Sequence, residues 1–402
     1  MEYKVFWCRL NKFYANQWIN YFEDNNIYDK NNFLIASCEV TDRAKSKWLR
    51  EVKQNINKWY NVHITWCWSI EKWNLIDKET FYKRHPELIA YKNNITLLPE
   101  SPKWDNLNYI DWDKNNFTKK FVIIQNWCDT NCTFCLTIKK RGASKNREIE
   151  DIIEEIKLAE AKWAKEIVLT WINLSAWWAS NTRNANESKF SYLLKTILKR
   201  TNIERIRISS LSPEFLDDMF FEIAQEKRIM PFFHFSIQSF SDKILKLMNR
   251  NYDSKRLNEV LNKTMNIKRN DGIKINLWAD IIVWFPWEEE WDYIETYNWI
   301  KNYKITNLHA FPFSSHMRGE WVPASKLKNQ IESSIKKERE RSILNLAEKQ
   351  KNEFFQSNKW KKANVLIEKV KDWYSYWWTE NYIYQSIKWK YNKWEIIVKN
   401  ID

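Results

Sequence analysis

Three cysteines near residue 130 have the spacing of ligands to a metal cluster. Cys128, Cys132 and Cys135 form the segment CDTNCTFC, which follows an apolar stretch with the pattern of a strand, Phe121 to Gln125. Three such thiolates can bind three irons of a 4Fe–4S cluster and leave the fourth iron open to a substrate or cofactor. Zinc is the alternative, but a structural zinc site needs a fourth Cys or His nearby, and no further one lies between Asn116 and Asn202.

The other three cysteines, Cys8, Cys38 and Cys67, lie in residues 1–85 and each follow a short strand-like segment. Helical stretches alternate with these segments, from Tyr14 to Asn25 and from Arg43 to Lys58. The alternation predicts an open α/β sheet. Residues that follow its strands gather at one edge, where ligands bind.

Residues 119–355 predict a barrel-like domain followed by a connecting helix. Strand candidates alternate with helical stretches, of which Glu148 to Lys162 carries Ile and Ala on one face. The six candidates are Phe121 to Gln125, Glu166 to Thr170, Arg205 to Ser209, Phe232 to Ile237, Ile275 to Val283 and Leu308 to Phe313. Repeated βα units of this kind predict a partial (β/α)6 barrel, whose chemistry lies on the loops after the strands.

The remaining residues predict a linker and a small basic module. Residues 86–118 contain three Pro and no clear periodicity, which indicates a linker. Residues 356–402 contain short strand-like segments and predict an all-β domain. Residues 326–402 hold 17 Lys and Arg against 10 Asp and Glu. Together with Tyr374, Tyr376, Tyr382 and Tyr384, this charge suits RNA binding by base stacking, although ordinary core tyrosines are the alternative.

The whole chain is basic, with 65 Lys and Arg against 51 Asp and Glu. A net charge of +14 favours a polyanionic partner, although a chain rich in Lys, Asn and Ile also arises from AT-rich coding. No apolar run reaches 18 residues, and the start MEYKVFWCRLN lacks a secretory pattern. We therefore expect a cytoplasmic protein without a membrane partner. In that reducing setting, six cysteines are more often ligands or reactive thiols than disulfides.

These motifs together resemble the radical S-adenosylmethionine (SAM) methylthiotransferases. The segments QNWCDTNCTFC, EIVLTWINLSAWW, FHFSIQSFSDKILKLMNR, DIIVWFPWE and HAFPFS occur in the family's order, and the resemblance covers nearly the whole chain. It implies a flavodoxin-like N-terminal α/β domain, a radical SAM barrel and a C-terminal TRAM-like RNA-binding domain. It also implies two 4Fe–4S clusters, one held by Cys128, Cys132 and Cys135, and the other by Cys8, Cys38 and Cys67.

The resemblance further implies a reaction and its partners. The enzymes of this family are transferases that add a methylthio group, and LTWINLSAWW is most similar to the class that modifies C2 of N6-threonylcarbamoyladenosine at position 37 of tRNA. Classes that modify isopentenyladenosine in tRNA or an Asp of a ribosomal protein are alternatives, and a non-catalytic iron–sulfur RNA-binding protein is an alternative of another kind. The expected partners are the tRNA anticodon stem-loop and an electron donor such as flavodoxin or ferredoxin. The expected SAM contacts are Thr170, Trp171, Ser236 and Gln238; no catalytic residue is assigned.

The chain contains only 3 Gly but 26 Trp, whereas average usage of roughly 7% Gly would give about 28. Trp127, Trp171, Trp284 and Trp287 stand where the resemblance implies Gly. The codon UGA specifies Gly in some bacterial codes and Trp in others, and a bulky indole is strained in a backbone turn that needs positive φ. We therefore predict that many Trp positions are Gly in the cell, whereas a few, such as Trp18 or Trp48, are genuine.

Overall fold

The computed structural model places most of the chain in two compact units. It describes residues 2–6, 9–27, 30–37, 42–72, 74–99, 101–102, 118–126, 128–136, 144–162, 164–170, 173–179, 188–315, 322–328 and 333–401. Unit 1 comprises residues 1–115, 127–144 and 314–326, and unit 2 comprises residues 116–126, 145–313 and 327–402. No helix among the described residues is long and apolar enough to cross a membrane.

Unit 1 is built on a parallel sheet in the order β1-β2-β3-β6. Its strands are β1 (Glu2–Val5), β2 (Asn32–Ser37), β3 (Asn61–Trp66) and β6 (Ile95–Leu97), and a hairpin adds β4 (Ile70–Glu71) and β5 (Asn74–Leu75). The helices are α1 (Arg9–Asp24), α2 (Asp42–Ile56), α3 (Lys78–Arg84), and the 3-10 segments η1 (Pro86–Asn94) and η5 (Pro323–Lys326). The open parallel α/β sheet is as predicted. Its order places β1 at an edge, whereas the first strand of the flavodoxin order lies inside the sheet.

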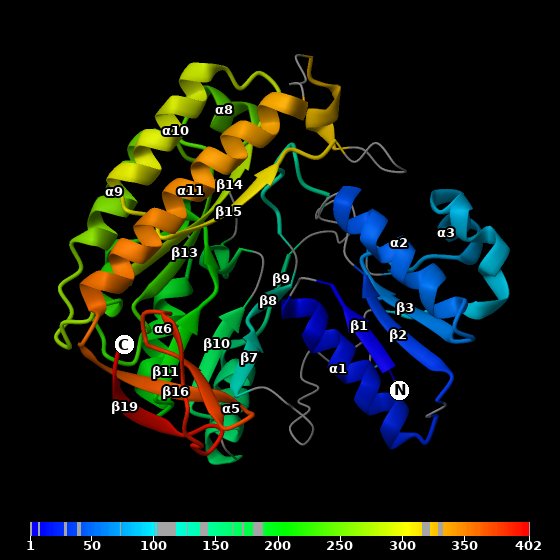
Figure 1. Ribbon diagram of the computed structural model, residues 1–402, viewed down its shortest axis with the longest axis horizontal. Helices are drawn as coiled ribbons and strands as arrows, with labels where there is room; N and C mark the ends of the chain where they lie inside the picture. The colour runs from blue at the N-terminus through cyan, green and yellow to red at the C-terminus, as the bar shows by residue number, and fades with distance from the viewer. Residues whose placement is uncertain are drawn as a thin grey trace. The chain divides into compact units, whose positions relative to one another are not determined.

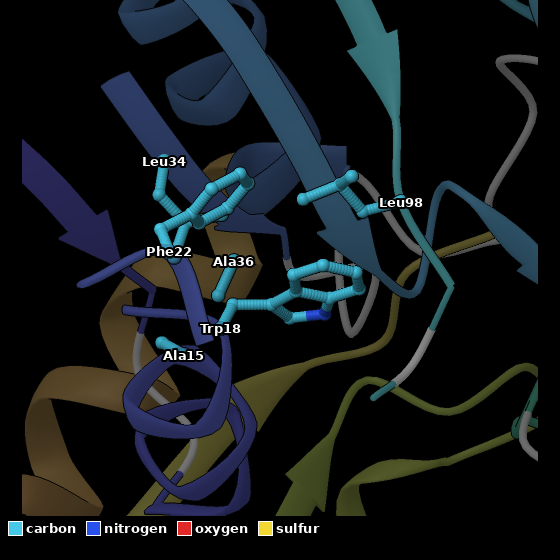
Figure 2. Packing of buried hydrophobic residues seen from close by; sticks show 6 residues of the cluster. All are labelled: Ala15, Trp18, Phe22, Leu34, Ala36 and Leu98. Carbon is cyan, nitrogen blue, oxygen red and sulfur yellow. The ribbon is translucent and has the colours of Figure 1, made fainter. Parts of the chain in front are cut away.

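Helix α1 is held to this sheet by an apolar cluster (Figure 2). Trp18 and Phe22 of α1 pack with Leu34 of β2 and with Leu98, and each is less than a tenth exposed. The indole nitrogen of Trp18 donates to the carbonyl oxygen of Pro99 at 3.0 Å. Trp18 therefore fills the core with its indole, as expected of a genuine tryptophan.

Part of the predicted linker belongs to the N-terminal sheet. Ile95–Leu97 forms β6 beside β3, with Ile95 and Leu97 buried. The prediction that residues 86–118 form a linker is therefore wrong for the first third of that range. Strand β6 was missed because its three residues, next to Pro and Asn, give too short an alternation to recognise. Residues 103–117 lie outside the described residues.

The described residues of unit 2 form six parallel strand positions, one of them interrupted, in two hydrogen-bonded sheets ordered β7-β10-β11 and β12-β13-β14-β15 (Figure 1). The strands are β7 (Lys119–Ile123), β10 (Glu166–Thr170), β11 (Arg205–Ile208), β12 (Ser210–Leu211), β13 (Phe232–Gln238), β14 (Asn276–Val283) and β15 (Asn307–Pro312). The predicted strand Arg205 to Ser209 forms β11, and the short β12 that follows it continues the same strand position. The predicted partial barrel of six βα units is therefore confirmed.

The helices of unit 2 come between the strands. They are α5 (Ile149–Lys162), α6 (Phe190–Arg200), α7 (Asp218–Ile223), α8 (Asp242–Leu247), α9 (Ser254–Met265) and α10 (Glu290–Asn302), with short segments η2 (Leu174–Ala176) and η4 (Pro213–Phe215) and a small pair, β8 (Gln125–Asn126) and β9 (Lys145–Asn146). The connecting helix α11 (Ser333–Asn358) runs along α10, where the Gln350 amide donates to the carbonyl oxygen of Lys301 at 2.9 Å.

The C-terminal module is an antiparallel sheet in the order β18-β17-β16-β19. Its strands are β16 (Lys362–Lys371), β17 (Tyr374–Trp378), β18 (Tyr384–Ile387) and β19 (Ile396–Asn400). The all-β prediction is confirmed, although β17 was not predicted, since three adjacent aromatic residues obscure its alternation.

This module is fixed to the first residues of the barrel strands by buried charges. Glu166, fully buried at the start of β10, lies 2.7 Å from both Arg205 and Arg207 and 3.6 Å from Lys119. Burial alone would raise the pKa of Glu166, but the three cations outweigh it and hold that pKa well below its usual range. Arg207 also donates to the Glu380 carbonyl oxygen at 3.2 Å, and Arg205 donates to that of Asn364 at 3.2 Å. Through Arg205 and Arg207, the Glu166 carboxylate therefore connects the start of the barrel strands to the C-terminal module.

Many tryptophans occupy backbone positions that suit glycine. Among the described residues, 15 non-glycine residues have positive φ, and eight of these are Trp. They are Trp59, Trp66, Trp178, Trp284, Trp287, Trp360, Trp373 and Trp394, with φ between 55° and 76°. Left-handed backbone is rare for bulky residues, and it is where glycine ends a helix. Trp59 and Trp360 follow α2 and α11 in this way and are 89% and 68% exposed, so their indoles fill no core.

Candidate cluster and cofactor sites

The first cysteine motif forms a compact turn in unit 1. Within it, the backbone N–H of Cys135 donates to the Cys132 carbonyl oxygen at 3.1 Å, and the N–H of Cys132 donates to Thr130. The Asp129 carboxylate braces the turn because it accepts from the backbone N–H of Ser144 at 2.8 Å and from the Ser144 hydroxyl. The N–H of Ala324 donates to the carbonyl oxygen of Thr133 at 2.9 Å.

The three sulfur atoms of this turn lie close enough to interact electrostatically. Burial raises the pKa of the Cys128 thiol to about 12, and the neighbouring Cys132 and Cys135 raise it further. The Cys128 thiol therefore resists ionisation on its own, whereas a cationic iron core favours its thiolate form. A set of three sulfur donors fits a 4Fe–4S cluster with one open iron.

The second cysteine trio falls only partly within the described residues. Cys67 directly follows β3 and is buried. Cys8 and Cys38 lie outside the described residues, but the strands that precede them end at the same edge of the sheet as β3: Val5 of β1 lies opposite Ala36 of β2, and Ser37 of β2 lies opposite Trp66 of β3. The assignment of these three cysteines to one cluster stays a prediction.

A buried polar network fixes the chain next to all three of these cysteines. The side-chain amide of Asn11 donates to the carbonyl oxygens of Phe6 at 2.9 Å and of Ser37 at 3.0 Å. The Ser37 hydroxyl donates to the Thr65 carbonyl oxygen at 2.9 Å and accepts from the backbone N–H of Trp68 at 3.1 Å. Sequence analysis did not find Asn11 or Ser37; only the closeness of Asn11 to Cys8 hinted at a role.

The predicted SAM contacts that the structure describes lie at or near the ends of two barrel strands. Thr170 is the last residue of β10 and lies opposite Ile123, the last residue of β7. Trp171 lies outside the described residues. Ser236 donates to the Leu211 carbonyl oxygen at 3.2 Å, while Gln238 is buried with φ of 69°, after a bulge that interrupts the strand alternation. The roles of these residues in SAM binding stay predictions.

His234 of β13 lies beside an aspartate of the neighbouring strand β14. Its Nε2 lies 2.9 Å from Oδ1 of Asp280, and Nδ1 of His309 lies 3.1 Å from the same oxygen. Burial would raise the pKa of Asp280, but the two imidazoles outweigh it and hold that pKa below its usual range. The sequence analysis missed Asp280 and His309 because each is a single ionisable residue in its strand. Only the register between the strands shows that they lie on the same face as His234.

Comparison with known proteins agrees with the geometry. Residues 122–300 match the model of the radical SAM superfamily. Proteins of that superfamily use SAM and a 4Fe–4S cluster, which are the cofactors that the sequence predicts. The cysteine turn of residues 128–135 lies within the matched residues and directly follows strands β7 and β8.

The curated relatives are tRNA methylthiotransferases, which confirms the predicted resemblance. The chain is 36% identical over 250 residues to the threonylcarbamoyladenosine tRNA methylthiotransferase MtaB of Aquifex aeolicus, and 34% identical over 253 residues to that of Rickettsia prowazekii. Each match covers 62% of this chain but 58% of the relative. The tRNA-2-methylthio-N(6)-dimethylallyladenosine synthase of Orientia tsutsugamushi strain Boryong is 27% identical over 369 residues, or 84% of this chain and 80% of that protein.

Proposed function

We propose that the protein is a radical SAM transferase that adds a methylthio group to C2 of N6-threonylcarbamoyladenosine at position 37 of tRNA. The observation that carries the proposal is the turn that holds Cys128, Cys132 and Cys135 close together after the first strands of the residues that match the radical SAM superfamily. A three-sulfur site leaves one iron for SAM, as this chemistry requires.

The cysteines have two separate roles in this proposal. Cys128, Cys132 and Cys135 hold the cluster that binds SAM, and Cys8, Cys38 and Cys67 hold the second cluster. The clusters, when bound, supply the electron for SAM cleavage and the site of sulfur delivery. Asp129 and its bonds to Ser144 keep the first turn folded, and the Cys132 ligand is itself buried away from water. Thr170, Trp171, Ser236 and Gln238 orient SAM.

The C-terminal module supplies a surface for the tRNA anticodon stem-loop. Tyr374 and Tyr376 lie on one face of β17, and the ring of Tyr376 is stacked with Tyr384 of β18, with 6.2 Å between centroids. The Lys369 ammonium lies 5.8 Å from the Tyr376 ring centre. Partly exposed aromatic rings beside a cation suit stacking with RNA bases and contact with phosphates.

Tyr382 does not belong to this surface. It is 9% exposed, its ring centre lies 4.6 Å from the Arg207 guanidinium, and its ring stacks on that of Trp378. For this residue the alternative of an ordinary core tyrosine is correct. The RNA surface is therefore the Tyr374, Tyr376 and Tyr384 face.

The similarity of the relatives supports the threonylcarbamoyl class. Identity is 34–36% to relatives of that name and 27% to the dimethylallyladenosine synthase from Orientia. That synthase aligns over more of the chain, so isopentenyladenosine in tRNA is retained as the second candidate substrate. An electron donor such as flavodoxin or ferredoxin completes the proposed system.

Nucleoside analysis tests the proposal. In tRNA from a strain that lacks the gene, 2-methylthio-N6-threonylcarbamoyladenosine should disappear while its unmethylthiolated precursor accumulates. The gene should restore the nucleoside, and a gene with Cys132→Ala should not. Loss of the methylthiolated isopentenyl nucleoside instead would select the second candidate. Unchanged levels of both nucleosides would reject tRNA methylthiolation.

A further inference from the structure

Two histidines and an aspartate meet on one face of the β12-β13-β14-β15 sheet. His234 belongs to β13, Asp280 to the central strand β14, and His309 to β15. Asp280 lies opposite His309 in the strand register. His234 lies opposite Trp278, which is two residues before Asp280 and therefore on the same face. Three neighbouring strands thus each contribute one ligand-type side chain.

The atoms that could bind a cation are already at suitable distances. Oδ1 of Asp280 lies 2.9 Å from Nε2 of His234 and 3.1 Å from Nδ1 of His309, and all three ligand atoms lie within 4.8 Å of one another. Ligand atoms at right angles around a cation, each about 2.1 Å from it, lie about 3 Å apart. Small shifts of the two rings would therefore complete the site.

The negative charge of the Asp280 carboxylate also favours a bound cation. Asp280 has a side chain that is only 20% exposed, and its ion-pair partners among the described residues are these two imidazoles. Shielded carboxylates in proteins are usually paired or bound to a metal, and a divalent cation between the three groups would balance the charge of Asp280.

We propose that His234, Asp280 and His309 bind one divalent transition-metal cation, separately from the iron–sulfur clusters. Two imidazole nitrogens and one carboxylate oxygen suit Mn²⁺, Fe²⁺ or Zn²⁺. Because the three ligands come from one sheet face, the remaining coordination positions are open to water or to an oxygen-donor group of a ligand. The side chain of His309 is 45% exposed, so this open side is accessible.

The site is tested with Mn²⁺ on the full chain carrying its reconstituted, oxidised clusters. Mn²⁺ prefers imidazole and carboxylate to thiolate, so it does not compete for the cysteines. Free Mn²⁺ is followed by electron paramagnetic resonance during a titration of chelator-treated protein. We expect one bound Mn²⁺ per chain, and binding at least about tenfold weaker in Asp280→Asn and in His309→Gln. His309→Gln changes a half-exposed side chain and should fold normally.

Asp372→Asn, in an exposed turn of the C-terminal module, is the matched control and should bind as the wild type does. Absence of a site in the wild type, or equal binding by all four proteins, would overturn the proposal and leave a hydrogen-bonded cluster without metal. The measurement needs no turnover. Its result is therefore independent of whether the chain methylthiolates tRNA.

Discussion

The side-chain amide of Asn11 lies 3.0 Å from the carbonyl oxygen of Ser37, and it joins the helix after Cys8 to the residue before Cys38. The same amide donates to the Phe6 carbonyl oxygen, two residues before Cys8. Asn11 is completely buried. One side chain therefore sets the spacing between two of the three cysteine-bearing segments, and Ser37 connects them to the third.

Asn11→Ala should weaken binding of the second cluster without affecting the first. It leaves two carbonyl oxygens without this donor in a buried setting, which costs about 1–3 kcal/mol for each group. Iron in the anaerobically reconstituted protein should fall from about eight per chain toward about four. Asn25→Ala, directly after the same helix, removes an exposed amide that donates to Tyr21 and should leave iron unchanged. Equal iron in both variants would contradict the positioning role of Asn11.

Glu166→Gln should destabilise unit 2 strongly. The change leaves Arg205, Arg207 and Lys119 buried without their shared negative partner, and breaking a buried pair in this way costs about 3–5 kcal/mol. The thermal unfolding midpoint should drop well below that of Glu204→Gln, which removes an exposed pair with Lys165 and should change stability by less than about 1 kcal/mol. Similar midpoints for the two variants would show that the buried network is not needed.

Glu288 should make stability fall as the pH rises. Burial raises the pKa of Glu288 from its ordinary 4.5 to about 7. Between these values the folded state binds the proton more tightly than the unfolded state, so the free energy of unfolding decreases with pH, by at most about 3 kcal/mol. Glu288→Gln should remove that decrease, and exposed Glu348→Gln should retain it. Thermal unfolding at pH 5, 6, 7 and 8 measures the slopes, and the same slope in all proteins would refute the raised pKa.

The strained tryptophans should be glycines in the natural protein. Peptides that contain Trp59, Trp284 or Trp360, purified from the source cells, should have masses lower by the Trp–Gly difference at each site, and the codons there should be UGA. Replacement of the exposed Trp59 or Trp360 by Gly should raise stability by about 1–2 kcal/mol, because a side chain in left-handed backbone is strained. Trp18→Gly should do the opposite, since Trp18 fills the core of unit 1. UGG codons at all three positions would disprove the substitution.

Local patterns in the sequence predicted most of the fold. Strands β10 and β13 were placed nearly to the residue, because continuous apolar stretches bounded by helices identify buried parallel strands. Strand β6 was missed since three residues carry too little pattern. The Glu166 network and the His234, Asp280 and His309 group depend on the register between distant strands, which single-strand patterns do not contain. Tyr382 was misassigned because composition does not distinguish a ring in an interface from one on the surface.

The iron content of the reconstituted protein tests the central claim most directly. Two sites of three cysteines each predict about eight irons per chain, and about four after Cys8, Cys38 and Cys67 are changed to Ala. A second variant with Cys128, Cys132 and Cys135 changed to Ala should also retain about four, and should lose the ability to cleave SAM. About four irons in the unaltered protein, or about eight after loss of either trio, would contradict the account.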